Sequence, residues 1–224
     1  MRARLAPITL ALLAALAAAP LFLNSGFLNT RGGGDSPFLL FRLQQLYTAL
    51  SQGVFPVRWM PDAAFGLGYP FFNYYAALPF YVAALLHALG SSFVVALKLT
   101  HLIGFIAAAL GMYGWMRSAN ANRAASWLAA VAYTFAPFHL VNVYVRGDSL
   151  SEFWAFALFP LCLWAARRLA DQPSYSRGLP LALAYAALLL THNISALIFS
   201  PFLGLYILFL AFSRQPPAAS RHSA

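Results

Sequence analysis

Long apolar runs separated by short polar stretches dominate the chain. A membrane-spanning helix needs about 20 apolar residues, because the hydrocarbon core is about 30 Å thick and an α-helix rises about 1.5 Å per residue. The runs that reach or approach this length cover residues 5–23, 93–116, 124–141, 153–170 and 179–212, and a shorter run covers 74–89. The pattern predicts an all-α protein, a polytopic transmembrane helix bundle with about six spans.

The composition agrees with this pattern. Of 224 residues, 62% are hydrophobic and 8% are charged, whereas a soluble domain carries about 25% charged residues. Such a chain has too little polar surface for a soluble particle and too much apolar surface for a disordered one. Its single cysteine, Cys162, excludes a disulfide scaffold. The net charge of +9 is scattered between apolar runs, so we expect no nucleic-acid partner.

The basic residues predict how the helices are oriented. Short loops rich in Lys and Arg stay in the cytoplasm. The basic groups that separate the runs are Arg2/Arg4, Arg117/Arg123, Arg167/Arg168/Arg177 and Arg214/Arg221. With all of them inside, the N-terminus is cytoplasmic and residues 24–92 form a long outer loop. The first run also resembles a signal peptide, but its full spanning length favours a retained helix.

Two runs allow alternative interpretations. Residues 74–89 fit a helix at the outer interface, because a span there would invert the later orientation; a short span is the alternative. Residues 179–212 are too long for one span and short for two. With Arg177 and Arg214 both inside, they form a hairpin that turns at residues 191–193, and a single tilted helix is the alternative.

The outer loop contains a second predicted surface helix. Asp35 or Ser36 can cap a helix over residues 37–50, and its leucines recur at helical spacing on one side. We expect this helix to lie on the membrane surface. The prolines in 54–62 predict non-helical chain. We interpret residues 1–214 as a single transmembrane domain and residues 215–224 as a disordered polar tail.

The carboxylates are distributed unevenly. Asp35, Asp62, Asp148 and Glu152 are all external under this orientation, and Asp171 is internal. The ordinary interpretation is helix capping by Asp35 and by the 146–152 loop. The functional one is a shared site, since ionised groups at a membrane boundary are costly and tend to be functional.

In such a site a carboxylate can act as a general base, and Arg146 can bind a phosphate. No cofactor is certain from the sequence, but a divalent cation (Mg²⁺ or Mn²⁺) between Asp35, Asp148 and Glu152 is chemically reasonable. His192 is either a hydrogen-bonded buried histidine or a functional one.

Several motifs resemble a known superfamily. The segment Gly34-Asp35-Ser36-Pro37-Phe38 resembles the first-loop acidic motif of the GT-C superfamily of membrane glycosyltransferases, which use polyprenyl-phosphate-linked sugars. Three further blocks resemble a bacterial branch labelled membrane proteins related to 6-pyruvoyl-tetrahydropterin synthase. These blocks cover residues 65–75, 144–153 and 190–193.

The resemblance implies an integral protein of the bacterial inner membrane, part of the cell envelope, that transfers a sugar from a polyprenyl-phosphate carrier to an acceptor on the extracytoplasmic side. Its implied partners are membrane lipids and the lipid-linked sugar donor. Superfamily members usually have more helices, so we expect a fragment or a split half, with a partner polypeptide supplying the rest. The alternatives are a non-catalytic protein that binds or assembles lipid-linked glycans and, less favoured, a transporter.

The resemblance also assigns residues to roles. The implied catalytic residues are Asp35, Asp148 and Glu152. The implied substrate-binding residues are Arg146, His192, Asn193, Tyr69 and Asn73.

Overall fold

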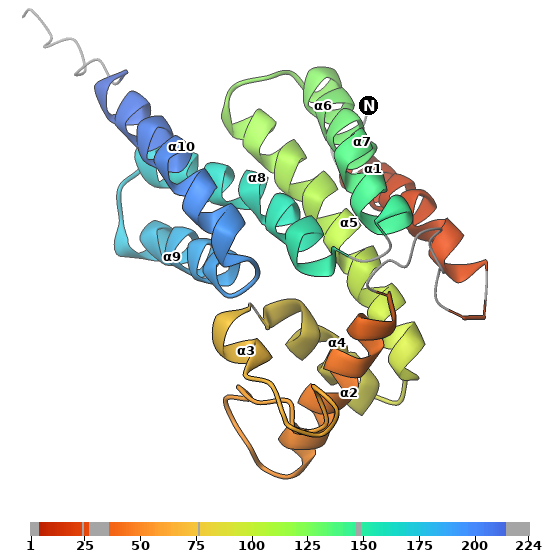
Figure 1. Ribbon diagram of the computed structural model, residues 1–224. Helices are drawn as coiled ribbons and strands as arrows, with labels where there is room; N and C mark the ends of the chain where they lie inside the picture. The colour runs from red at the N-terminus through yellow and green to blue at the C-terminus, as the bar shows by residue number, and fades with distance from the viewer. Residues whose placement is uncertain (1–4, 24, 27–35, 76, 147–148, 214–224) are drawn as a thin grey trace, which may run out of the picture.

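The computed structural model describes residues 5–23, 25–26, 36–75, 77–146 and 149–213. In these residues the chain is a bundle of helices without a named strand (Figure 1), which confirms the predicted all-α class. The elements are α1 (Leu5–Ala18), the 3₁₀ turn η1 (Ala19–Phe22), α2 (Ser36–Ser51), α3 (Phe71–Tyr74), α4 (Leu78–Ala88), α5 (Phe93–Ser118), α6 (Arg123–Thr134), α7 (Pro137–Leu140), the π turn η2 (Val141–Val145), α8 (Leu150–Asp171), α9 (Tyr175–Leu189) and α10 (Asn193–Phe212).

Within the described residues, five helical stretches are long and apolar enough to cross a membrane. They are Leu5–Phe22, Phe93–Ser118, Arg123–Val145, Leu150–Asp171 and Asn193–Phe212. The third stretch continues through η2 to Val145, four residues beyond the end of the predicted run 124–141. These five stretches make the protein a multi-pass membrane protein of the expected kind, and the shorter α4 is also apolar.

Helix α1 packs beside α6 in the same direction. The indole Nε1 of Trp127 donates to Thr9 Oγ1 at 3.0 Å near the start of both helices. At the other end, the hydroxyl of Tyr144 donates to the carbonyl of Ala17. The first apolar run is therefore an integral part of the bundle.

Helices α5 and α8 also run parallel to each other, along a seam of glycines on α5. Gly104 lies against Phe153 near the start of α8, and Gly114 lies against Trp164 near its end. A side chain at either glycine would overlap the facing ring, so glycine permits this close approach. This direction agrees with the predicted topology, in which both helices cross the membrane in the same sense.

The last apolar run folds as a hairpin. Helix α9 ends at Leu189 and α10 begins at Asn193. The hydroxyls of Tyr185 and Ser200 lie 2.7 Å apart and link the antiparallel arms. The predicted hairpin is therefore confirmed, and the alternative of a single tilted helix is wrong, because the chain turns at residues 190–192.

The helix predicted at 37–50 is present as α2, but its apolar side faces protein. Leu39, Leu43 and Leu46 are fully buried in the main core, where α2 packs on α4 and α5. The leucine stripe is thus covered by other helices, and the position of α2 at the membrane surface stays a prediction. Burial against α4 and α5 removes the same apolar area from water that lipid would have covered.

The helix predicted at 74–89 is shorter in the structure, where it is α4 (Leu78–Ala88). Helix α3 ends at Tyr74, and α4 starts one residue before Pro79, which fits the first turn of a helix. Its 11 residues span about 16 Å, about half the hydrocarbon core. Helix α4 is thus too short to be a spanning helix, which favours the interface interpretation.

The irregular segment between α2 and α3 is held by hydrogen bonds. The Gln45 amide donates to the Asp62 carboxylate at 2.7 Å and accepts from the Asp62 backbone N–H at 3.0 Å. Met60 and Tyr69 pair through two backbone bonds of 2.9 Å. The segment is therefore fixed to α2, with Gln45 almost fully buried.

The buried residues form two core clusters. The first joins α1, α2, α4, α5, α6 and the start of α8, and the second joins the rest of α8 to α9 and α10. Helix α8 belongs to both. In Figure 1 the α9–α10 pair stands on one flank of α8, and α2, α3 and α4 gather beyond the start of α5.

The parallel α5 and α8 give the bundle two distinct ends. We call one the arginine end, because it carries the basic groups of the loops that follow α5 and α8. Its residues are Arg117, Arg123, Arg167, Arg168 and Arg177. The other, which we call the site end, carries α2, α4 and the starts of α8 and α10.

Candidate functional site

A polar cavity of about 280 Å³ opens at the site end. It lies where α2, the residues around α3 and α4, the start of α8 and the start of α10 meet. Its lining residues are Leu39, Arg42, Tyr75, Phe80, Arg146, Ser149, Leu150, Ser151, Glu152, His192 and Ile194. Segments from the outer loop, the 146–152 loop and the α9–α10 turn thus share one cavity.

An ion pair forms one wall of the cavity. The Arg146 guanidinium donates to the Glu152 carboxylate and, at 2.9 Å, to the Asn142 side-chain oxygen. Glu152 lies in the first turn of α8, where the helix dipole stabilises a negative charge. The Arg146 side chain is 52% exposed and that of Glu152 23% exposed, so a ligand in the cavity can reach both.

A histidine caps the helix on the opposite wall. His192 Nδ1 accepts a hydrogen bond from the Ser195 backbone N–H at 3.2 Å, and the Ser195 hydroxyl lies 2.7 Å from the same nitrogen. Burial lowers the pKa of His192; Glu152 raises it and Arg146 lowers it further. The imidazole is therefore neutral at neutral pH. Because Nδ1 accepts, its proton is on Nε2.

A second arginine completes the cavity. The guanidinium carbon of Arg42 lies 4.3 Å from the centre of the Phe71 ring, a cation–π distance. Phe71 stacks on Tyr75, with ring centres 5.0 Å apart. The Tyr75 ring in turn meets His192 edge-on at 5.6 Å. An aromatic column therefore connects the arginine of α2 to the histidine of α10.

Arg42 and Tyr75 were not among the predicted site residues. In the sequence Arg42 fits the polar side of an amphipathic helix, and Tyr75 fits an interfacial aromatic. The signal available was an arginine one turn after Leu39, followed by the aromatic run 71–75. That signal does not indicate which residues meet.

Two buried polar atoms belong to residues that contact or precede residues of the cavity lining. Among the described residues, Asn142 Nδ2 and Thr191 Oγ1 are buried side-chain atoms without a hydrogen-bond partner. Asn142 holds Arg146, and Thr191 precedes His192.

The predicted site residues divide into three groups. Arg146, Glu152 and His192 line the same cavity. Tyr69, Asn73 and Asn193 do not line it: Tyr69 pairs with Met60, Asn73 is exposed, and Asn193 donates to the Tyr74 carbonyl at 3.2 Å. Asp35 and Asp148 lie outside the described residues. The catalytic and binding roles therefore stay predictions.

The predicted metal ligands are likewise described only in part. Glu152 is described, whereas Asp35 and Asp148 are not. Within the described part of the chain, no three His, Cys, Asp or Glu side chains are grouped to hold a metal ion. Mg²⁺ or Mn²⁺ binding remains a prediction that depends on those two aspartates.

The fold and cavity define a polytopic helical membrane protein with a polar, doubly basic pocket at one end of the bundle. Residues 72–220 match the family of the 6-pyruvoyl-tetrahydropterin synthase related domain, a membrane protein family, and the chain belongs to this family. The family label that the motifs indicated is confirmed.

The wider comparisons are sparse. The chain is similar to an uncharacterized protein of Lactococcus lactis subsp. cremoris (strain MG1363), at 23% identity over 186 residues. The match covers 81% of this chain and 30% of the relative, so the chain spans less than a third of that protein. No solved structure matches.

Proposed function

We propose that the cavity binds the phosphate of a polyprenyl-phosphate-linked sugar, and that the protein takes part in transferring this sugar to an acceptor on the extracytoplasmic side of the inner membrane. The observation that carries the proposal is the convergence of Arg42 and Arg146 on one polar cavity. Two permanent cations from separate elements suit a phosphate or pyrophosphate group.

The proposed chemistry is a single displacement. An acceptor hydroxyl attacks the anomeric carbon of the sugar while the bond from that carbon to the phosphate oxygen breaks. The proton of the hydroxyl goes to a carboxylate, and the phosphate keeps the electron pair of the broken bond. Arg42 and Arg146 stabilise the negative charge on the leaving phosphate, and His192 can donate a hydrogen bond to it from Nε2.

Two aspartates are proposed to complete this site. Asp35 directly precedes α2 and is four residues before Leu39, which lines the cavity; Asp148 directly precedes Ser149, which also lines it. In our proposal Asp35 is the general base, and Asp148 and Glu152 orient the acceptor or hold a divalent cation. Membership of the GT-C superfamily is part of this proposal.

Binding and transfer are tested separately. The protein is reconstituted in lipid nanodiscs and titrated with undecaprenyl phosphate. Arg42→Gln and Arg146→Gln should each weaken binding by at least tenfold, since a charge-assisted hydrogen bond contributes roughly 1.5–3 kcal/mol, or about 10- to 150-fold. Arg123→Gln removes the same charge at the arginine end and is the matched control. Equal binding by all three variants would contradict the phosphate site.

Transfer is measured with polyprenyl-phosphate-linked hexoses in membranes that hold the protein. Asp35→Asn should abolish transfer and leave undecaprenyl phosphate binding intact, because it removes the base but no cation. Chelation by EDTA should stop transfer, with recovery on adding Mn²⁺, if a cation bridges the carboxylates. Transfer that persists in EDTA would contradict the metal assignment alone.

A non-catalytic role in handling lipid-linked glycans is the second candidate. One observation favours it: Glu152 already pairs with Arg146, so the Glu152 carboxylate is engaged rather than free to act as a base. This candidate predicts that the arginine variants lose binding while no hexose is transferred by the wild type.

A further inference from the structure

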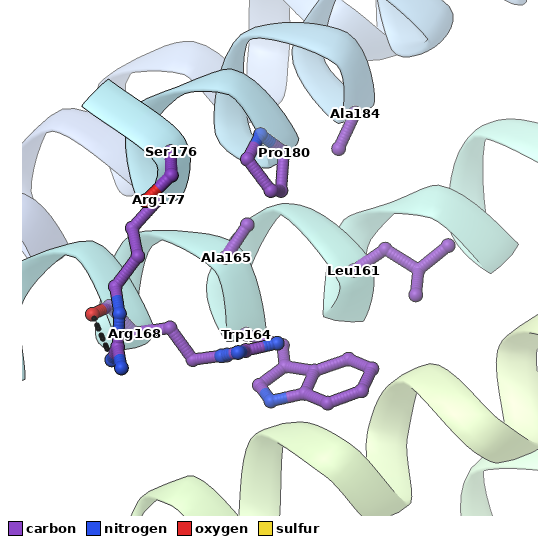
Figure 2. A pocket seen from close by; sticks show the side chains of 8 residues that line it. All are labelled: Leu161, Trp164, Ala165, Arg168, Ser176, Arg177, Pro180 and Ala184. Atoms are coloured by element: carbon purple, nitrogen blue, oxygen red, sulfur yellow. Dashed lines mark hydrogen bonds between the residues drawn. The ribbon is translucent and has the colours of Figure 1, made fainter. Parts of the chain in front are cut away.

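A second pocket lies at the arginine end, between α8 and α9 (Figure 2). Its volume is about 240 Å³. Arg168, Arg177 and Ser176 form its polar side, and Leu161, Trp164 and Pro180 are among its apolar walls. On α8, Leu161 and Arg168 of this pocket lie 9 and 16 residues after Glu152 of the polar cavity, about 14–24 Å along the helix.

The polar side concentrates positive charge. Arg177 Nη1 donates to the backbone carbonyl of Arg168 at 3.3 Å, which brings the two arginines together (Figure 2). The Arg168 guanidinium carbon lies 5.9 Å from the Trp164 ring centre. In the described residues, the nearby Asp171 pairs with Arg167 instead, at 3.1 Å. The geometry thus places two cations at one pocket without a carboxylate partner among the described side chains.

A separate apolar groove lies on another face of α9. A groove between α9 and α10, of about 410 Å³, is lined by Tyr185, Leu203, Gly178 and Gly204 among others. A methyl group added at Gly178 or Gly204 would meet no atom within 4 Å, so the surface is open there. Such a groove in a membrane-spanning hairpin can hold a hydrocarbon chain.

We propose that this pocket is a binding site for a phospholipid with an anionic headgroup. The headgroup phosphate takes the place between Arg168 and Arg177, with Ser176 as a further hydrogen-bond donor, and an acyl chain follows the walls of α8 and α9. Pairs of arginines recognise phosphate well. Basic pockets between helices on the cytoplasmic side of a membrane bind anionic headgroups of this kind. The amphiphilic lining favours a lipid over a free phosphate ion.

The experiment uses the whole chain in detergent, stripped of lipid, and measures quenching of tryptophan fluorescence by phosphatidylglycerol with brominated acyl chains. Brominated phosphatidylcholine is the zwitterionic comparison, and inorganic phosphate and glycerol phosphate are added as soluble competitors. Trp164 lines the pocket, so Trp164→Phe should remove most of the quenching specific to phosphatidylglycerol. Equal quenching in that variant would place the lipid elsewhere.

The charge requirement is tested with a double variant. Arg168→Gln with Arg177→Gln should weaken phosphatidylglycerol binding by about thirtyfold, from roughly fivefold for each arginine near a membrane surface. Arg117→Gln with Arg123→Gln removes the same charge at the same end outside the pocket and should change it less than twofold. Arg168→Lys with Arg177→Lys keeps the charge and should retain most binding.

Three outcomes would overturn the proposal: equal loss in the pocket and control double variants, equal affinity for the zwitterionic lipid, or full displacement by millimolar inorganic phosphate. The last would indicate a site for a soluble anion. Binding of undecaprenyl phosphate at the site end is measured in the same variants and should be unchanged, because this lipid site is independent of the proposed sugar transfer.

Discussion

The glycine seam between α5 and α8 allows a sharp test of the packing. In Gly104→Ala, the new methyl carbon would lie 2.5 Å from Cε1 of the Phe153 ring, a distance that real contacts do not allow. Phe153 cannot turn away easily, because it is fully buried and packs against Phe105 at 4.7 Å and His101 at 5.9 Å between ring centres. The variant must shift the two helices apart or strain the ring.

The expected cost follows from this overlap. Overpacking a core typically costs 1–3 kcal/mol, whereas alanine in place of glycine in a helix gains about 0.5–1 kcal/mol. The net effect should be about 1–2 kcal/mol of destabilisation. For a chain of this size, that corresponds to a fall of roughly 2–8 °C in the unfolding temperature.

The matched control is Gly204→Ala, within α10, where the added methyl group meets nothing within 4 Å. This variant keeps the helix-propensity gain without the overlap, so its unfolding temperature should stay equal or rise by a few degrees. Both variants are measured by thermal unfolding in the same detergent, followed by intrinsic fluorescence. If Gly104→Ala is as stable as Gly204→Ala, then α5 and α8 do not pack as closely as described.

Three further outcomes follow from the site end. Burial lowers the pKa of His192 below its usual 6.5. Its contribution to stability is therefore complete above pH 6.5 and decreases as the pH falls from 6.5 toward the lowered pKa. In detergent, the unfolding temperature of the wild type should fall more between pH 8 and pH 5 than that of His192→Asn, which keeps a helix cap without titrating. Asp62→Ala leaves the Gln45 amide nitrogen buried and without its partner, so it should lower the free energy of unfolding by about 1–3 kcal/mol and speed proteolysis after α2. Adding Gln45→Leu should restore part of the lost stability, and no recovery in the double variant would contradict this reasoning. Arg146→Gln should lower the free energy of unfolding by less than about 1 kcal/mol, because the ion pair of Arg146 with Glu152 is partly exposed. A larger fall in thermal stability would indicate that Arg146 has a structural rather than a binding role.

Much of the fold could be predicted because membrane helices obey simple rules of length and charge. The spans and the α9–α10 turn follow from apolar runs that must match the hydrocarbon core. The parallel α5 and α8 follow from placing Arg117 and Arg168 on one side. That the leucines of α2 face other helices could not be predicted, since a leucine stripe has the same sequence pattern whether it meets lipid or another helix.

The candidate site could be predicted only in part. Arg146 and Glu152 are close in sequence, so one loop was enough to suggest that they act together. The contributions of Arg42 and Tyr75 depend on how the outer loop folds back on α8 and α10, which no local pattern specifies. Asn193 follows His192 directly, yet it bonds to the Tyr74 carbonyl instead of lining the cavity, because neighbouring residues at the start of a helix point in different directions.

The division of α8 between two core clusters has a mechanical consequence. Among the described residues, two hydrogen bonds join the turn of the α9–α10 hairpin to the outer loop: the Leu78 N–H donates to the Leu190 carbonyl at 2.9 Å, and the Asn193 side chain donates to the Tyr74 carbonyl. Two further contacts hold the same hairpin: the Trp115 indole N–H on α5 donates to the Tyr206 hydroxyl at 2.9 Å, and Phe199 stacks on Phe159 of α8. Helix α10 is therefore anchored both at its start and toward its end, which fixes the width of the entrance between the hairpin and the outer loop.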